Sequence, residues 1–77
     1  MPRVAKEGGI EFVVHLREQP FEPPHVHVFY GSIEVRIDLN RGQFIDEPPP
    51  GKAAAIMRAY RKHVVTIRDA WDTYHKR

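Results

Sequence analysis

The sequence contains no cysteine, so neither a disulfide framework nor a thiolate metal site is available to it. It also lacks any run of the roughly 20 apolar residues that a membrane-spanning helix needs. The first residues, MPRVAKEGG, do not contain the apolar core of a secretory signal. From these absences we expect a soluble, cytoplasmic protein that makes no membrane contact.

Functional signatures are also scarce. There is no glycine-rich phosphate loop, no coenzyme fingerprint, and no serine or cysteine in a recognisable nucleophile motif. The chain has 77 residues and no internal repeat. A chain of this size forms one small core, so we expect a single domain over residues 1–77.

The net charge of +2 hides an uneven distribution. Residues 1–50 carry five Lys or Arg and eight Asp or Glu, whereas residues 51–77 carry seven Lys or Arg and two Asp. A basic surface attracts anionic partners, and basic residues also serve as the solvated outer face of a helix. Candidate RNA- or DNA-binding residues in the basic half are Arg58, Arg61, Lys62 and Arg68.

Alternation of apolar and polar residues predicts a strand at 10–17, because side chains of a strand point to opposite faces in turn. Its apolar positions are Ile10, Phe12, Val14 and Leu16. Gly8 and Gly9 precede it as a turn.

A hairpin is predicted at 25–39, where HVHVFY and IEVRIDL are separated only by Gly31-Ser32. Glycine in the first position of a two-residue loop favours a type II′ turn. That turn sets the register and brings the apolar residues together on one face. On the other face, the predicted pairs are Phe29 with Glu34, His27 with Arg36, and His25 with Asp38.

A short strand at 43–45 and a long helix at 52–74 complete the prediction. Apolar residues in the helix recur every three or four positions, at Ala53, Met57, Tyr60, Val64, Ile67, Trp71 and Tyr74. We therefore expect Tyr60, Trp71 and Tyr74 in the core and His75 in solvent. The fold class is α+β, with a small, mainly antiparallel sheet of three to four strands packed on one long C-terminal helix.

The stretch PPHVHVFYG, together with Pro2, Gly9-Ile10, His63 and Trp71, resembles a family of short bacterial proteins. It is the domain of unknown function family 4160, and its most specific part here is the Pro-Pro-His-x-His motif that ends at His27. The resemblance implies a bacterial source and a second small protein encoded beside this one, in an arrangement similar to toxin–antitoxin pairs.

Two kinds of chemistry are open to the His-x-His strand. A ribonuclease-like toxin would use His25, His27, Asp38 and Arg36 as catalytic residues, with imidazole as the base and guanidinium at the phosphate. A metal-dependent enzyme would bind zinc or another divalent ion through His25, His27 and Asp38, with His15 as a third imidazole. The plainer alternative is that the imidazoles hydrogen-bond locally and brace the start of the strand.

The leading interpretation is a non-enzymatic binding component without a cofactor, whose partner is a small protein or a second copy of the chain. Val13 and Phe29 would then form the partner-binding patch on the sheet face that the helix leaves uncovered. Whether the chain is an enzyme stays open at this point.

Overall fold

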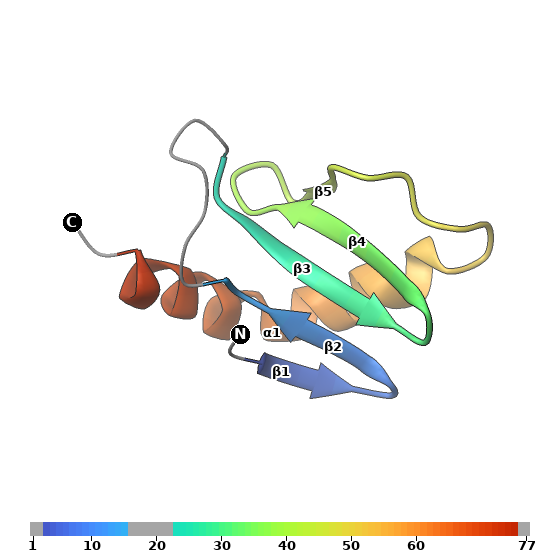
Figure 1. Cartoon of the computed structure of the whole chain (residues 1–77), viewed down its shortest axis with the longest axis horizontal. Coiled ribbons are helices and arrows are strands. Elements are labelled where there is room, and N and C mark those ends of the chain that lie inside the picture. Colours follow the sequence, from blue (N-terminus) through green and yellow to red (C-terminus); the bar gives the residue numbers. More distant parts are fainter. Residues whose placement is uncertain (1–2, 16–22, 76–77) are drawn as a thin grey trace.

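The computed structural model describes residues 3–15 and 23–75. Five strands form one antiparallel sheet in the order β1-β2-β3-β4-β5, so each strand pairs with its neighbour in sequence. One helix, α1, covers a single face of this sheet and lies behind it in Figure 1. The strands are β1 (Arg3–Glu7), β2 (Ile10–Val13), β3 (His25–Tyr30), β4 (Ile33–Asp38) and β5 (Gln43–Phe44), and the helix α1 is Ala53–Tyr74. The predicted α+β class is confirmed.

Strand β1 is one strand more than the prediction allowed. Gly8 and Gly9 both have positive φ, at 55° and 80°, and close a two-residue turn that returns the chain antiparallel to β2. Positive φ at both positions is the type I′ geometry of tight hairpins. The strand has few apolar residues and a break in its register between Arg3 and Ala5, which explains why alternation did not reveal it.

The predicted hairpin is confirmed with its register. Tyr30 pairs with Ile33, Val28 with Val35 and Val26 with Ile37. Gly31 has φ of 64°, and no residue other than glycine has positive φ in the described chain, which matches the type II′ turn. Strand β2 ends earlier than predicted, at Val13, and Leu16 and Arg17 of the predicted strand lie outside the described residues.

The core lies between the sheet and α1. Phe12, Ile37, Ile56 and Ile67 are each 0% exposed. Burying an aliphatic or aromatic side chain of this size stabilises a fold by about 1.5–3 kcal/mol. Tyr60 and Trp71 pack in or against this core as predicted, whereas Tyr74 is 38% exposed. No helix in the described part of the chain is long and apolar enough to cross a membrane.

The last turns of α1 extend past the ends of β1 and β2 (Figure 1). Tyr74 lies there, where none of the five described strands is opposite, so its exposure follows from the length of the helix. The start of β3 and the end of β4 lie at the same end of the molecule. The His-x-His motif therefore sits where the sheet meets the C-terminal half of α1.

Candidate functional site

The sheet face that points away from α1 carries its side chains in rows, because paired residues on adjacent strands lie side by side. The first row is Glu11, Phe29 and Glu34, and the second is Val13, His27 and Arg36. We call these six residues the open face. A third pair, His25 and Asp38, follows at the end of the hairpin.

His27 is only 8% exposed although it belongs to the open face. The His15 ring lies over it, with ring centroids 3.7 Å apart and planes 8° from parallel. Its Nδ1 lies 3.3 Å from a carboxylate oxygen of Glu34, so a neighbour in the first row accepts a hydrogen bond from it. His15 therefore lies next to the motif by stacking on His27, and its predicted role as a third metal ligand stays a prediction.

His25 is 1% exposed and contacts the helix. Its ring lies edge-on to the His27 ring, with centroids 5.0 Å apart, and its centroid is 5.8 Å from that of the Trp71 ring. Its Nδ1–H donates to the carbonyl oxygen of Pro23 at 2.9 Å. His25 lies across from Asp38 as predicted, but its ring is buried against Trp71 and is not turned away from the packed interior as expected. We call His15, His25 and His27 the histidine cluster.

Trp71 extends this cluster to the end of the helix. The His75 ring stacks on the indole at 3.7 Å, and His75 Nδ1 lies 3.2 Å from the Trp71 carbonyl oxygen. His75 is partly buried and not fully solvated as expected, since one turn of helix places it directly on the indole. The spacing of four residues between Trp71 and His75 is the signal that could have indicated this contact.

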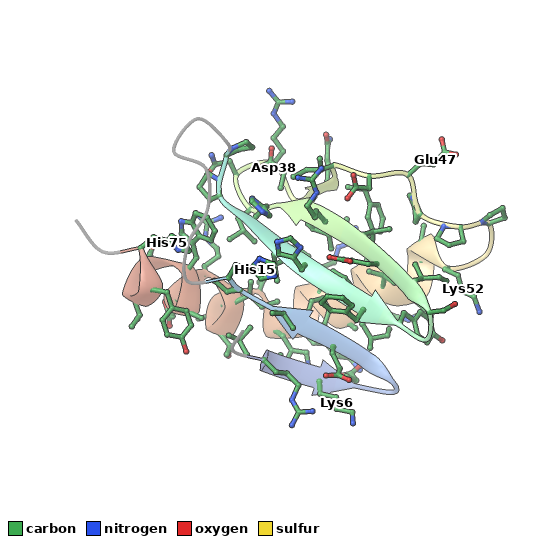
Figure 2. All side chains as sticks on the ribbon, in the orientation of Figure 1. Lys6, His15, Asp38, Glu47, Lys52 and His75 are labelled. Carbon is green, nitrogen blue, oxygen red and sulfur yellow. The ribbon has the colours of Figure 1, made fainter. Side chains whose placement is uncertain are left out.

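Asp38 pairs with His25 in the strand register, but its side chain hydrogen-bonds to the turn that follows β4. Its Oδ1 accepts hydrogen bonds from the backbone N–H groups of Asn40, at 2.8 Å, and Arg41, at 3.2 Å. Aspartate commonly closes turns in this way. The carboxylate is thus used for local structure at the β4–β5 connection, and Figure 2 shows it at the end of β4.

Arg36 is held by a residue that the sequence did not indicate. Its Nε and Nη2 donate to the two carboxylate oxygens of Asp46 at 3.0 and 3.1 Å, and its backbone N–H also bonds to Asp46 at 3.0 Å. These hydrogen bonds lower the pKa of Asp46. The guanidinium predicted to stabilise a phosphate therefore fastens the segment after β5 to β4. Asp46 lies beyond a turn, so no local spacing pairs it with Arg36.

A metal site gains no support. Among residues 3–15 and 23–75, no three histidine, aspartate or glutamate side chains are arranged to hold an ion. His25 and His27 are neighbours, but the Asp38 carboxylate bonds to the turn. Metal binding by His25, His27 and Asp38 stays a prediction, because the structure does not arrange these three side chains to hold an ion.

The four basic residues predicted to bind nucleic acid are divided between two environments. Lys62 Nζ lies 3.1 Å from a carboxylate oxygen of Glu7, and Arg68 donates to the carbonyl oxygen of Leu39. Arg58 and Arg61 are exposed on the outer side of α1. Nucleic-acid binding by these residues stays a prediction.

Glu7 fixes β1 to the helix through Lys62 and His63. His63 Nε2–H donates to its second carboxylate oxygen at 3.1 Å, alongside Lys62. The hydrogen bonds from Lys62 and His63 lower the pKa of Glu7. This cluster was not predicted, because it requires the unpredicted strand β1.

The predicted partner-binding pair differs in accessibility. Val13 is 7% exposed, whereas Phe29 is partly buried, with the more accessible side chains of Glu11 and Glu34 on either side. Arg3 approaches Glu11 at 3.5 Å from β1. Next to this face, a depression of about 440 Å³ is lined by Pro23, Arg36, Asp38, Arg41, Gln43, Phe44 and Ile45.

The family model described as a domain of unknown function (DUF4160) matches residues 9–72 of the chain. The match begins at the turn before β2 and ends within α1, so it includes the histidine cluster and the open face. No curated protein and no solved structure gives a significant match.

Proposed function

The chain belongs to the family described as a domain of unknown function (DUF4160), and we propose that it is a non-enzymatic binding component of a small cytoplasmic two-protein module of the toxin–antitoxin type. The partner is a small protein, and it binds to the open face of the sheet. The observation that carries the proposal is the row of Glu11, Phe29 and Glu34 across three strands.

The composition of this row suits a protein partner. Neighbouring strands lie about 4.8 Å apart, so the backbone positions of Glu11 and Glu34 are about 10 Å apart, with Phe29 between them. The side chain of Glu11 is 40% exposed and that of Glu34 is 52% exposed, so a partner can reach both, although Glu11 also pairs with Arg3 and Glu34 with His27. An aromatic anchor with a polar rim is typical of interface centres. The matching partner surface is an apolar side chain flanked by lysine or arginine.

The contacts of the histidine cluster favour binding over catalysis. His25 bonds to Pro23 and packs on Trp71, Asp38 caps a turn, and Arg36 holds Asp46. Each of these groups makes a contact that supports the fold, so a catalytic role would require it to break that contact. The same contacts support the bracing role that was the plainer alternative for the histidines.

Co-expression with the small protein encoded next to this chain tests the proposal. We expect the two proteins to co-purify, and Phe29→Ser to abolish co-purification because it removes the anchor. Tyr74→Ser is the matched control, since Tyr74 is an exposed aromatic residue on the helix, outside the open face. Retention of the partner by Phe29→Ser at the wild-type level would contradict the proposal.

A charge reversal examines the chemistry of the partner. Glu11→Lys with Glu34→Lys should weaken binding by at least about tenfold, because lysines would then face the partner's cations. The ribonuclease-like alternative makes a different prediction: expression alone would arrest growth, and a folded His27→Ala variant would relieve the arrest.

A further inference from the structure

On the side of α1 opposite the core, basic and acidic residues occupy positions that are symmetric about Val65. This stripe consists of Arg58, Arg61, Val65, Asp69 and Asp72, with spacings of three, four, four and three. At 3.6 residues per turn, all five lie within about 80° of the helix circumference. All five are exposed, and Val65, at the centre, is 69% exposed. Because the buried residues of α1 (Ile56, Ala59, Tyr60 and Ile67) pack toward the sheet, this exposed stripe lies on the side away from it.

The order of these charges is not explained by the helix itself. A helix favours acidic residues near its N-terminus and basic residues near its C-terminus. In α1 the first turn has no acidic residue and the last turn has no basic residue, while Asp72 lies in that last turn. Within residues 3–15 and 23–75, no ion pair engages Arg58, Arg61, Asp69 or Asp72.

A second copy of the chain would supply ion-pair partners for these four residues. We propose that α1 pairs antiparallel with α1 of a second copy, about a two-fold axis that passes beside Val65. Arg58 then faces Asp72 of the second copy, Arg61 faces its Asp69, and the two Val65 side chains meet at the centre. Because a two-fold axis repeats each contact, the dimer contains every charge pair twice.

The flanking residues are compatible with this arrangement. Lys62 and Arg68 lie on the two sides of the stripe and would bring like charges near each other, but Lys62 bonds to Glu7 and Arg68 to Leu39. These bonds hold both cations toward the sheet and away from the contact between the two helices. The stripe and the open face lie on opposite sides of the molecule, so the dimer and the proposed partner complex do not compete.

We expect the affinity of the proposed dimer to be low. Its apolar part is one valine from each copy, and exposed ion pairs are screened by salt. Interfaces of this small size form transient complexes. We expect dissociation in the micromolar range or above at low salt, with at least about a tenfold loss of affinity in about 0.5 M salt.

Charge variants test the pairing. Arg58→Asp with Arg61→Asp makes the stripe wholly acidic, and Asp69→Arg with Asp72→Arg makes it wholly basic. In sedimentation equilibrium at low salt, we expect each double variant alone to be monomeric and their equimolar mixture to form a one-to-one dimer. The variant with all four changes should dimerise like the wild type, because every pair is exchanged but conserved.

The control separates this pairing from a general charge effect. Lys6→Glu with Arg41→Asp changes the net charge by the same amount as the acidic variant at exposed positions away from the stripe. It should leave the dimer unchanged, as should Phe29→Ser, so failure here is distinguishable from failure of the proposed function. Circular dichroism reports whether each variant is folded.

A wild-type protein that stays monomeric up to about 1 mM at low salt would overturn the inference. So would a mixture of the two double variants that does not associate. Should a double variant fail to fold, the wild type still decides the question by NMR dilution. The inference requires concentration-dependent amide shifts around Val65, and shifts confined to the sheet or absent everywhere would contradict it.

Discussion

Replacing His25 by alanine should destabilise the fold substantially. The side chain is 1% exposed, donates to the carbonyl oxygen of Pro23 at 2.9 Å, and contacts two aromatic rings. Leaving a buried acceptor without its donor costs about 1–3 kcal/mol. Removing the ring also leaves a cavity beside Trp71, so we expect a loss of about 2–4 kcal/mol. A domain of this length has only about 4–12 kcal/mol of stability in total.

A second substitution separates the ring from its hydrogen bond. His25→Phe fills the space beside Trp71 but cannot donate to Pro23, so its loss should be limited to about 1–3 kcal/mol. Gln43→Ala is the control, because Gln43 is exposed on a strand at the edge of the sheet and should change stability by less than about 0.5 kcal/mol.

Urea unfolding followed by circular dichroism and by the fluorescence of Trp71 measures both effects. Trp71 is the only tryptophan, and its ring lies next to His25 and His75, so its emission reports on this end of the fold. If His25→Ala unfolded within about 0.5 kcal/mol of the wild type, the ring would contribute nothing to the fold. The reasoning that assigns the histidine cluster a structural role would then be refuted.

Three further outcomes are expected. The pKa of Asp46 is lowered by its bonds to Arg36, so the contribution of this pair is present above the unfolded carboxyl pKa of about 3.9 and is lost as the pH falls through the folded value. Asp46→Asn should therefore cost up to about 1 kcal/mol at pH 7 and nothing near pH 2, which urea titrations at the two pH values would reveal, and equal costs at both would exclude the ion pair as the cause. Ile67→Ala, at a position 0% exposed, should cost about 2–5 kcal/mol in the same assay, and a cost below 1 kcal/mol would mean that the helix is not packed there. Gly31→Ala should lower the thermal midpoint because φ there is 64°, whereas an unchanged midpoint would contradict the type II′ turn.

Much of the fold could be predicted because its local signals agree. A two-residue turn at Gly31 fixed the register of β3 and β4, and the recurring apolar residues placed α1 to within one residue of its observed start. Strand β1 was missed because its residues, RVAKE, contain little of the alternation that marks a half-buried strand. The paired glycines before β2 were the available signal, since a tight turn requires a strand on each side.

The site was less predictable, because its contacts are tertiary. The strand register correctly placed His25 across from Asp38. It did not indicate that Trp71 would reach His25, since this depends on where β2 ends and how far α1 extends. Arg36 likewise was assigned to a phosphate because its partner, Asp46, comes from a segment whose path no local pattern defines.

The central claim is that the histidine cluster supports the fold while the open face binds the partner. Calorimetric titration with the proposed partner, a small protein encoded beside this chain, tests it most directly, at a temperature where circular dichroism shows every variant folded. We predict that Phe29→Ser raises the dissociation constant by at least about tenfold and that His25→Phe leaves it within about twofold of the wild type. The opposite result, with binding lost in His25→Phe and kept in Phe29→Ser, would contradict the claim.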